Sequence, residues 1–224
     1  MTIDSSINQP PILSLPGRER KNDDIFARGA AGEKPFAYLY EQQHVEIVHG
    51  PSFAAEKELF ADRCAADGVP ITERRGGGGT VTLSPGTLII VAVGERRDGG
   101  LERAQSVFRR VNGAIIAALK KGGVDNAVEA GVSDIAVGGR KILGSSLYMG
   151  SKPPLFYYQS SLMVSNDLSL MDKYLRHPPR EPEYRKGRKH GEFCTTLRER
   201  GLTVGTDELI RLIKAELMDR LGAA

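Results

Sequence analysis

The chain contains no apolar run near the roughly 18 residues that a membrane-spanning helix requires, so no membrane partner is predicted. Residues 1–9 are polar and lack the basic and then apolar pattern of a secretion signal. Cysteine is scarce, with two in 224 residues, which argues against a disulfide framework. No Cys or His pair has metal-ligand spacing, so structural zinc is not expected. These absences predict a cytoplasmic protein.

The composition is that of a soluble globular protein, with 40% hydrophobic and 26% charged residues. The length allows one large domain or two small ones with a substantial core. Residues 1–20 contain Pro and Ser with little pattern, and we expect them to form a flexible N-terminal arm. We expect residues 21–224 to form a single domain.

The most informative stretch is a glycine loop, in which Arg74 and Arg75 precede four consecutive glycines, 76–79, and then Thr80. Arginine presents a planar fork of donors suited to carboxylates and phosphates. Glycine lets a ligand lie against the backbone. Because this loop opens a strand instead of a helix and lacks Gly-Lys-Ser/Thr, it is neither a Walker A loop nor a dinucleotide fingerprint. The glycines alone are equally compatible with a flexible hairpin loop.

Hydrophobic periodicity, caps and turn residues predict the secondary structure. Helices are expected over 23–31, 52–67, 101–121, 168–175 and 206–222, and strands over 36–40, 45–48, 69–73, 81–83, 88–91, 134–137, 140–144 and 155–164. The first two strands are expected to pair with each other, and Gly138-Gly139 to turn a hairpin. Regular β–α–β alternation is missing, which favours an α+β fold with a mixed, largely antiparallel sheet flanked by helices.

Two further blocks follow the glycine loop in order, Gly-Gly-Arg-Lys-Ile-Leu-Gly-Ser over 138–145 and Tyr-Tyr-Gln-Ser-Ser-Leu-Met-Val over 157–164, the latter followed by Asn-Asp-Leu-Ser-Leu over 166–170. The ordered set resembles the lipoate–protein ligase family over about residues 35–200. This resemblance implies a catalytic domain of the biotin/lipoate ligase type. It also implies a two-step reaction, in which lipoate and ATP give lipoyl-AMP and the lipoyl group then passes to a lysine of a lipoyl-carrier protein.

The resemblance also implies roles for individual residues. Lys141 would be the catalytic cation, stabilising charge on oxygen during adenylation and transfer. Arg74 and Arg75 would flank the phosphates, and Asp134 would hold Mg²⁺ beside them. The slot for the acyl chain and the adenylate would be lined by Gly77, Gly78, Gly79, Thr80, Val81 and Thr82. No nucleic-acid partner is implied.

Several positions depart from the family pattern. Gly76 stands where the family has serine, Leu83 where it often has histidine, and Ser133 where it has asparagine. Many members also carry a C-terminal accessory domain of about a hundred residues, a common size for a domain. Since this sequence ends after one predicted helix, we expect that domain to be a separate polypeptide or to be unnecessary. The departures predict a divergent branch of the family.

Alternatives remain open beside the ligase. An octanoyl or lipoyl transferase would use Cys194 as a thioester nucleophile, and basic residues lie near it in sequence, but it lies beyond the region where the transferase cysteine is expected. A non-catalytic module would bind a lipoyl domain or nucleic acid through residues 176–200, which hold eight Lys/Arg and four Asp/Glu. That segment would otherwise pack over the adenylate site or stand in solvent.

Overall fold

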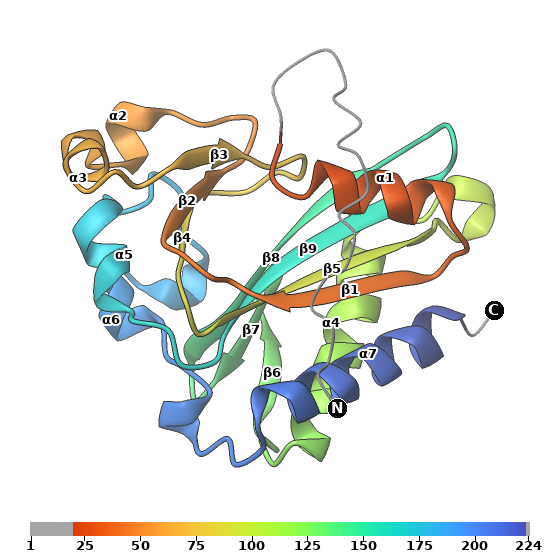
Figure 1. Cartoon of the computed structure of the whole chain (residues 1–224). Helices are drawn as coiled ribbons and strands as arrows, with labels where there is room; N and C mark the ends of the chain where they lie inside the picture. Colours follow the sequence, from red (N-terminus) through yellow and green to blue (C-terminus); the bar gives the residue numbers. More distant parts are fainter. Residues whose placement is uncertain (1–19, 223–224) are drawn as a thin grey trace, which may run out of the picture.

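The computed structural model describes residues 20–222 (Figure 1). A six-stranded sheet in the order β1-β5-β9-β8-β7-β6 forms the centre, and a three-stranded sheet in the order β3-β2-β4 lies beside it. The strands are β1 Phe36–Glu41, β2 Glu46–His49, β3 Ile71–Glu73, β4 Val81–Leu83, β5 Thr87–Glu95, β6 Ala127–Ala130, β7 Asp134–Val137, β8 Arg140–Met149 and β9 Leu155–Met163. All neighbours in the large sheet are antiparallel, whereas β2 and β3 are parallel. The predicted α+β class with a largely antiparallel sheet is confirmed.

Helices flank these sheets. They are α1 Asp23–Ala31, α2 Ala55–Glu58, α3 Ala61–Ala66, α4 Ala104–Lys121, α5 Ser169–Tyr174, α6 His190–Phe193 and α7 Thr206–Gly222, with 3-10 turns η1 Asp98–Gly100, η2 Glu183–Arg185 and η3 Arg198–Arg200. Within residues 20–222, no helix combines the length and apolar character needed to cross a bilayer. The predicted N-terminal arm lies outside the described residues apart from Arg20, so its conformation stays a prediction.

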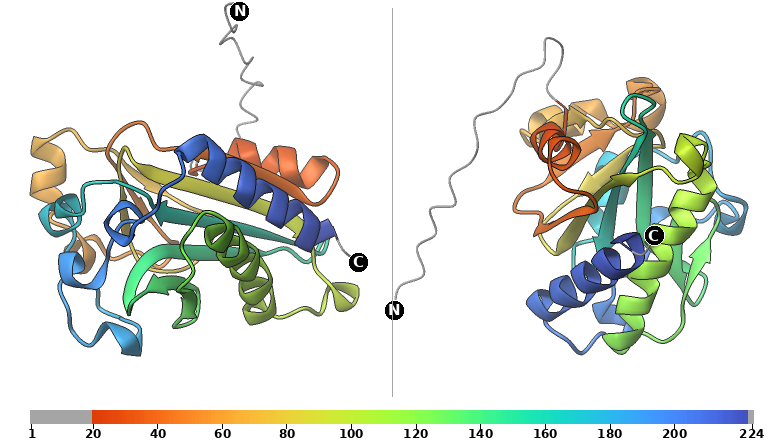
Figure 2. Two further views of the ribbon diagram at one scale, coloured as in Figure 1. Left: turned by 90° about the horizontal axis from the view of Figure 1, so that it is seen from below. Right: turned by 90° about the vertical axis from the view of Figure 1, so that its right-hand side faces the viewer.

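One face of the large sheet is covered by α4 and α7 (Figure 2). The apolar positions of α4 recur every three or four residues and meet Leu88, Ile90 and Leu162 of the sheet in one buried cluster. Leu209 and Ile213 of α7 join the same cluster. Close packing of fully buried side chains makes this layer the main core.

The opposite face is shared by α1 and the small sheet. Ile25 of α1, Val48 of β2 and Leu83 of β4 pack together against Ile89 and Val91 of β5. Figure 2 shows α1 on the side of the sheet away from α4 and α7. The small sheet therefore covers part of this face of the large sheet. The candidate site lies between the two sheets.

Two local predictions are wrong. Strands β1 and β2 do not pair with each other: β1 pairs with β5, and β2 pairs with β3 and β4. The helix predicted over 52–67 is split, because Leu59 is extended and forms a β-bridge with Leu175 while its side chain is buried. In both places a contact distant in sequence overrides the local pattern.

Candidate active site

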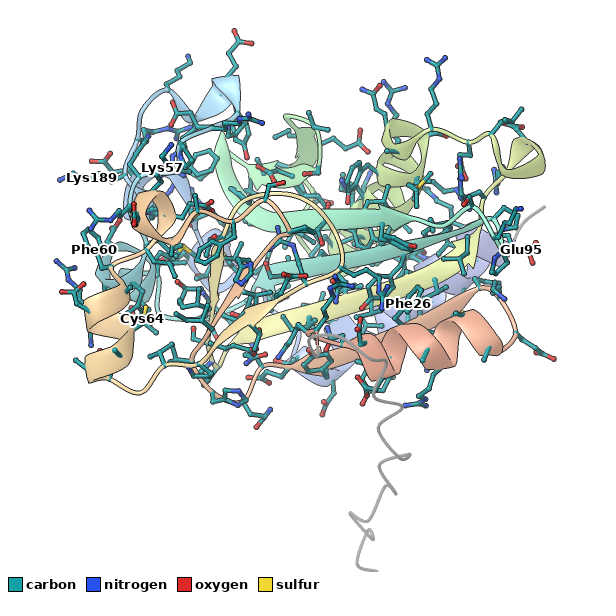
Figure 3. All side chains as sticks on the ribbon, turned by 90° about the horizontal axis from the view of Figure 1, so that it is seen from above. Phe26, Lys57, Phe60, Cys64, Glu95 and Lys189 are labelled. Atoms are coloured by element: carbon teal, nitrogen blue, oxygen red, sulfur yellow. The ribbon has the colours of Figure 1, made fainter. Side chains whose placement is uncertain are left out.

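A cavity of about 470 Å³ lies between the two sheets. Its wall is formed by residues 78–83 of the glycine loop and β4, by β5, β8 and β9, and by the segment that follows α5. That segment belongs to the end of the molecule where Figure 3 shows Lys57 and Lys189, away from Glu95. The volume is that of a typical small-molecule site.

Arg74 holds the glycine loop in shape. Its side chain is buried, and its Nη2 donates to the carbonyl oxygens of Gly77 at 3.0 Å and Gly79 at 2.8 Å, while Nη1 donates to Val48 at 3.3 Å. Burial lowers the pKa of Arg74 to about 10, so the guanidinium stays cationic at neutral pH. Arg74 lines the cavity, and its terminal nitrogens are taken up by the two loop carbonyls at Nη2 and by the carbonyl of Val48 in β2 at Nη1.

Arg75 lies outside the cavity. Its guanidinium is 3.0 Å from the Asp23 carboxylate and stacks 4.3 Å from the ring centre of Phe26 in α1. Gly77 is also absent from the cavity lining, whereas Gly78, Gly79, Thr80, Val81 and Thr82 all belong to it. The structure thus brings most of the predicted slot residues together and joins Arg75 to α1.

The loop passes close to backbone that tolerates no side chain. A Cβ on Gly50 would lie 2.6 Å from the carbonyl oxygen of Gly78, whose φ of +107° is itself a glycine conformation. A Cβ on Gly76 would lie 2.9 Å from Ser146 Oγ and 3.0 Å from the Leu147 nitrogen. The departure from serine at Gly76 therefore has a steric reason, because β8 runs against that residue.

Lys141 projects into the cavity from β8. Its Nζ is 2.9 Å from Asp134 Oδ1, and its side chain passes directly over Gly144, where a Cβ would lie 2.7 Å from Nζ. The pairing of β7 with β8 shifts register beside Lys141, an irregularity that redirects side chains in a sheet. The cation sits 23% exposed at the cavity wall, where a developing negative charge is screened less than in water.

Asp134 is engaged through both oxygens. Oδ1 faces Lys141, and Oδ2 accepts a 2.8 Å hydrogen bond from the hydroxyl of Tyr184. Burial and the neighbouring carboxylate hold the pKa of Tyr184 far above its usual value, so it remains a donor. Within residues 20–222, no three His, Cys, Asp or Glu side chains gather as a metal site. Asp134 as a ligand of Mg²⁺ therefore stays a prediction.

Cys194, which the sequence places beyond the region where the transferase cysteine is expected, lies beside Lys141 in the fold. The two residues form a parallel β-bridge, in which the nitrogen of Thr195 donates to the carbonyl of Lys141 at 2.9 Å. Cys194 lines the cavity and is buried. Burial raises the pKa of its thiol, against the opposing effect of the Lys141 charge, so the thiol is protonated at neutral pH.

Four buried side-chain oxygens in the cavity wall have no hydrogen-bond partner among residues 20–222: Thr82 Oγ1, Thr87 Oγ1, Gln159 Oε1 and Ser160 Oγ. Buried polar atoms are nearly always hydrogen-bonded, so this group is set up for polar atoms of a ligand or for water. Thr87 and Gln159 were missed from the sequence. The available signal was a polar stretch, Gln-Ser-Ser over 159–161, inside an otherwise apolar strand.

The basic segment after α5 closes one side of the cavity. Arg180, Arg185 and His190 line it, and Arg188 anchors the segment by donating to the carbonyl of Gly139 at 3.0 Å. Since Gly139 lies in the turn between β7 and β8, the segment is attached to the hairpin that carries Asp134 and Lys141. Of the sequence alternatives for this segment, packing over the site agrees with the structure.

Several known proteins are similar to this chain. A putative lipoate-protein ligase A from Aeropyrum pernix is 28% identical over 123 residues, which is 55% of this chain and 44% of that protein. A bi-partite lipoate protein ligase from Thermoplasma acidophilum, solved in a study that included its E2 lipoyl domain, superposes with a TM-score of 0.71 at 23% identity, covering 85% of this chain and 72% of that one.

Two further solved structures share the fold. A lipoate-protein ligase A bound with ATP has a TM-score of 0.71 at 23% identity, covering 85% of this chain and 74% of that one. A putative T. acidophilum lipoate protein ligase with bound lipoic acid has a TM-score of 0.72 at 22% identity, covering 88% of this chain and 78% of that one. The family model of the lipoyl protein ligase A/B catalytic domain matches residues 22–218, nearly the whole described chain. The chain therefore belongs to the lipoyl protein ligase A/B catalytic domain family.

Proposed function

We propose that this protein is an ATP-dependent lipoate–protein ligase. The observation that carries the proposal is the position of Lys141, whose Nζ lies over Gly144 in a cavity walled by the glycine loop. Two proteins of the same fold have been solved with ATP and with lipoic acid. A narrow wall without side chains suits an acyl chain, and a cation at its end suits an acid or a phosphate.

The proposed reaction has two steps. In the first, a carboxylate oxygen of lipoate attacks the α-phosphorus of ATP, the bond to the β-phosphate breaks, and lipoyl-AMP and pyrophosphate form. In the second, the neutral amine of a carrier lysine attacks the lipoyl carbonyl, AMP leaves, and the amine proton passes to solvent. Lys141 would stabilise the negative oxygen that develops in each step.

Roles for the other residues follow from their positions. Gly78 to Thr82 would line the acyl-adenylate slot, and Arg74 would maintain that wall. Arg75 is proposed to contact phosphate only after exchanging its Asp23 partner, because that ion pair holds it against α1. Asp134 is proposed to meet Mg²⁺ that arrives with the nucleotide phosphates, since magnesium is commonly held by one or two carboxylates together with phosphate.

The proposed acceptor is a lysine on a lipoyl-carrier domain. The bi-partite relative from T. acidophilum was solved in a study of an archaeal lipoylation system that included an E2 lipoyl domain. By analogy, a separate accessory polypeptide is proposed as a second partner.

The ligase is tested by incubating the protein with lipoate, ATP and Mg²⁺, with and without a lipoyl domain. We expect pyrophosphate release and a mass gain of one lipoyl group on the carrier, and no gain when the acceptor lysine is changed to arginine. Because an accessory chain is a proposed partner, the assay is run with and without the candidate polypeptide. Absence of both signals in every arm would refute the ligase.

A transferase is the second candidate, favoured by the β-bridge that sets Cys194 beside Lys141. There, the Cys194 thiolate would attack an acyl-carrier thioester and release the carrier thiol, and an acceptor amine would then displace the cysteine. Octanoyl transfer from acyl carrier protein without ATP, lost in Cys194→Ser, would establish this function. The raised pKa of the buried thiol disfavours it without an added base.

A further inference from the structure

Arg185, in the η2 turn, carries a buried nitrogen without a hydrogen-bond partner in the part of the chain that the structure describes. The residue is 4% exposed and lines the cavity, and its Nη2 is the buried atom that no residue from 20 to 222 reaches with a hydrogen bond. A charged donor removed from water in this way is costly unless it is paired. Arg185 Nη2 is therefore a donor at the cavity wall that can bind an anion.

The position of the Arg185 side chain is fixed by its neighbours. Its Nε donates to the carbonyl of Arg188 at 2.9 Å, and its guanidinium lies 4.9 Å from the ring centre of Phe193. Arg188 returns the contact, donating from Nε to the Arg185 carbonyl at 2.9 Å, and also binds Gly139 in the β7–β8 turn. These bonds hold the inner edge of the fork in place and leave Nη2 for a ligand.

The terminal nitrogens of the other lysine and arginine side chains that are buried or half-buried at the cavity already have partners. Lys21 is 2.5 Å from Glu46, Arg74 binds loop carbonyls, and Lys141 is 2.9 Å from Asp134. Arg185 also forms an ion pair, since Glu181 Oε2 lies 3.4 Å from its Nε, whereas Nη2 has no hydrogen-bond partner among residues 20–222. That carboxylate also receives a hydrogen bond from the Gly187 nitrogen and contacts His177.

Arg185 and Lys141 both line the cavity, which Cys194 lines as well. Lys141 is joined to Cys194 by the β-bridge, and the Arg185 guanidinium packs over the ring of Phe193, the residue before Cys194. The positive charges of both act on the Cys194 thiol. Two cations around one point match a ligand with an anionic oxygen beside its reacting centre.

We propose that Arg185 is a substrate-binding residue that donates from Nη2 to an anionic oxygen of the ligand, either the carboxylate of the acyl acid or the α-phosphate of the nucleotide. The choice of these two sources rests on the proposed ligase function. The contact holds the carboxylate or phosphate beside Lys141. It contributes nothing to the binding affinity of the uncharged part of the ligand.

The experiment is calorimetric titration of wild type and Arg185→Gln with four probes: lipoate, its neutral amide lipoamide, AMP and neutral adenosine. A charge-assisted contact predicts affinity about ten- to a hundred-fold weaker for lipoate or AMP, with lipoamide and adenosine unchanged. A loss confined to lipoate assigns the carboxylate, and a loss confined to AMP assigns the phosphate. Arg211→Gln, which removes one charge from the exposed side of α7, is the control and should bind all four probes as wild type does.

Equal binding of lipoate and AMP by wild type and folded Arg185→Gln overturns the proposal, whatever the ligase assay gives. If Arg185→Gln does not fold, Arg185→Lys replaces it, because lysine keeps the charge without the planar fork. Unchanged affinity in Arg185→Lys for both anionic probes then overturns the proposal. Arg185-dependent AMP binding without lipoate-driven pyrophosphate release would support this site and refute the ligase.

Discussion

The two faces of the six-stranded sheet differ although alternate residues of the same strands build them. On β5, Leu88 and Ile90 point toward α4 and α7 and are fully buried among apolar side chains. Thr87 and Ile89 point the other way and line the cavity. Because successive side chains in a strand face opposite sides, stability and ligand binding can be assigned to different residues of one segment. Substitutions on the two faces should therefore have separable effects.

The largest effect is expected on the cavity face at Lys141. Lys141→Ala should lower the rate of carrier modification by about a thousand-fold, since a positioned cation for a developing oxyanion is lost. Stability should change little, because the side chain is partly exposed and its Asp134 partner keeps the Tyr184 hydrogen bond. Single-turnover kinetics measure the rate of carrier modification, and urea denaturation measures the stability. Near-wild-type turnover in the variant would contradict the role of Lys141.

On the core face, Ile90→Ala should lower the free energy of unfolding by about 3 kcal/mol, the usual cost of a cavity left by a large aliphatic side chain. Ile90 is completely buried and its side chain belongs to the α4 and α7 layer. Activity per folded molecule, measured well below the melting temperature, should stay near wild type. A loss of activity in the folded protein would show that the two faces are coupled.

Thr87→Val tests the cavity face with a substitution that should raise stability and weaken ligand binding. Its Oγ1 is buried and has no partner within residues 20–222, which costs desolvation energy. Replacing the hydroxyl by a methyl of similar shape removes that cost, so the free energy of unfolding should rise by about 1 kcal/mol. Lipoate affinity should fall a few-fold if the hydroxyl serves the ligand. Chemical denaturation and calorimetry check these outcomes, with Ile89→Val as a nearby apolar control. A destabilised Thr87→Val would mean that the hydroxyl is already satisfied.

The smallest effect concerns His190. Burial, aided by the Arg185 charge and opposed by Asp172, holds the pKa of His190 below its ordinary value of about 6.5. The folded state then binds this proton less readily than the unfolded chain. The contribution of neutral His190 to the free energy of unfolding is fully present above about pH 6.5 and is lost as the pH falls below that value. Urea denaturation between pH 7.5 and 5 should show that the free energy of unfolding declines less steeply for His190→Gln than for wild type. Parallel curves would exclude the effect.

The features predictable from sequence were those encoded locally. The helix of residues 104–121 follows from its three- and four-residue apolar spacing, and the hairpin at Gly138-Gly139 from its turn residues. The glycine loop and Lys141 were singled out because their neighbours in sequence form recognisable blocks. Their convergence on one cavity agrees with that expectation.

Features that depend on distant contacts were not predictable. Nothing near β1 in the sequence indicates that its partner is β5 instead of β2. The proximity of Cys194 to Lys141, 53 residues away along the chain, arises from the path of the segment after α5. Arg74 is a further case, since a cation before glycines suggests an outward phosphate contact, and only the fold shows its Nη2 bound to the loop itself.

Those bonds from Arg74 have a kinetic consequence. A run of four glycines would normally sample many conformations, and a ligand would have to select among them. The guanidinium removes that freedom during folding, so the wall exists before the acyl chain arrives. Association should then occur in a single phase whose rate rises linearly with lipoate concentration. Arg74→Met should add a slower ordering phase that saturates, because the loop would have to settle after each encounter.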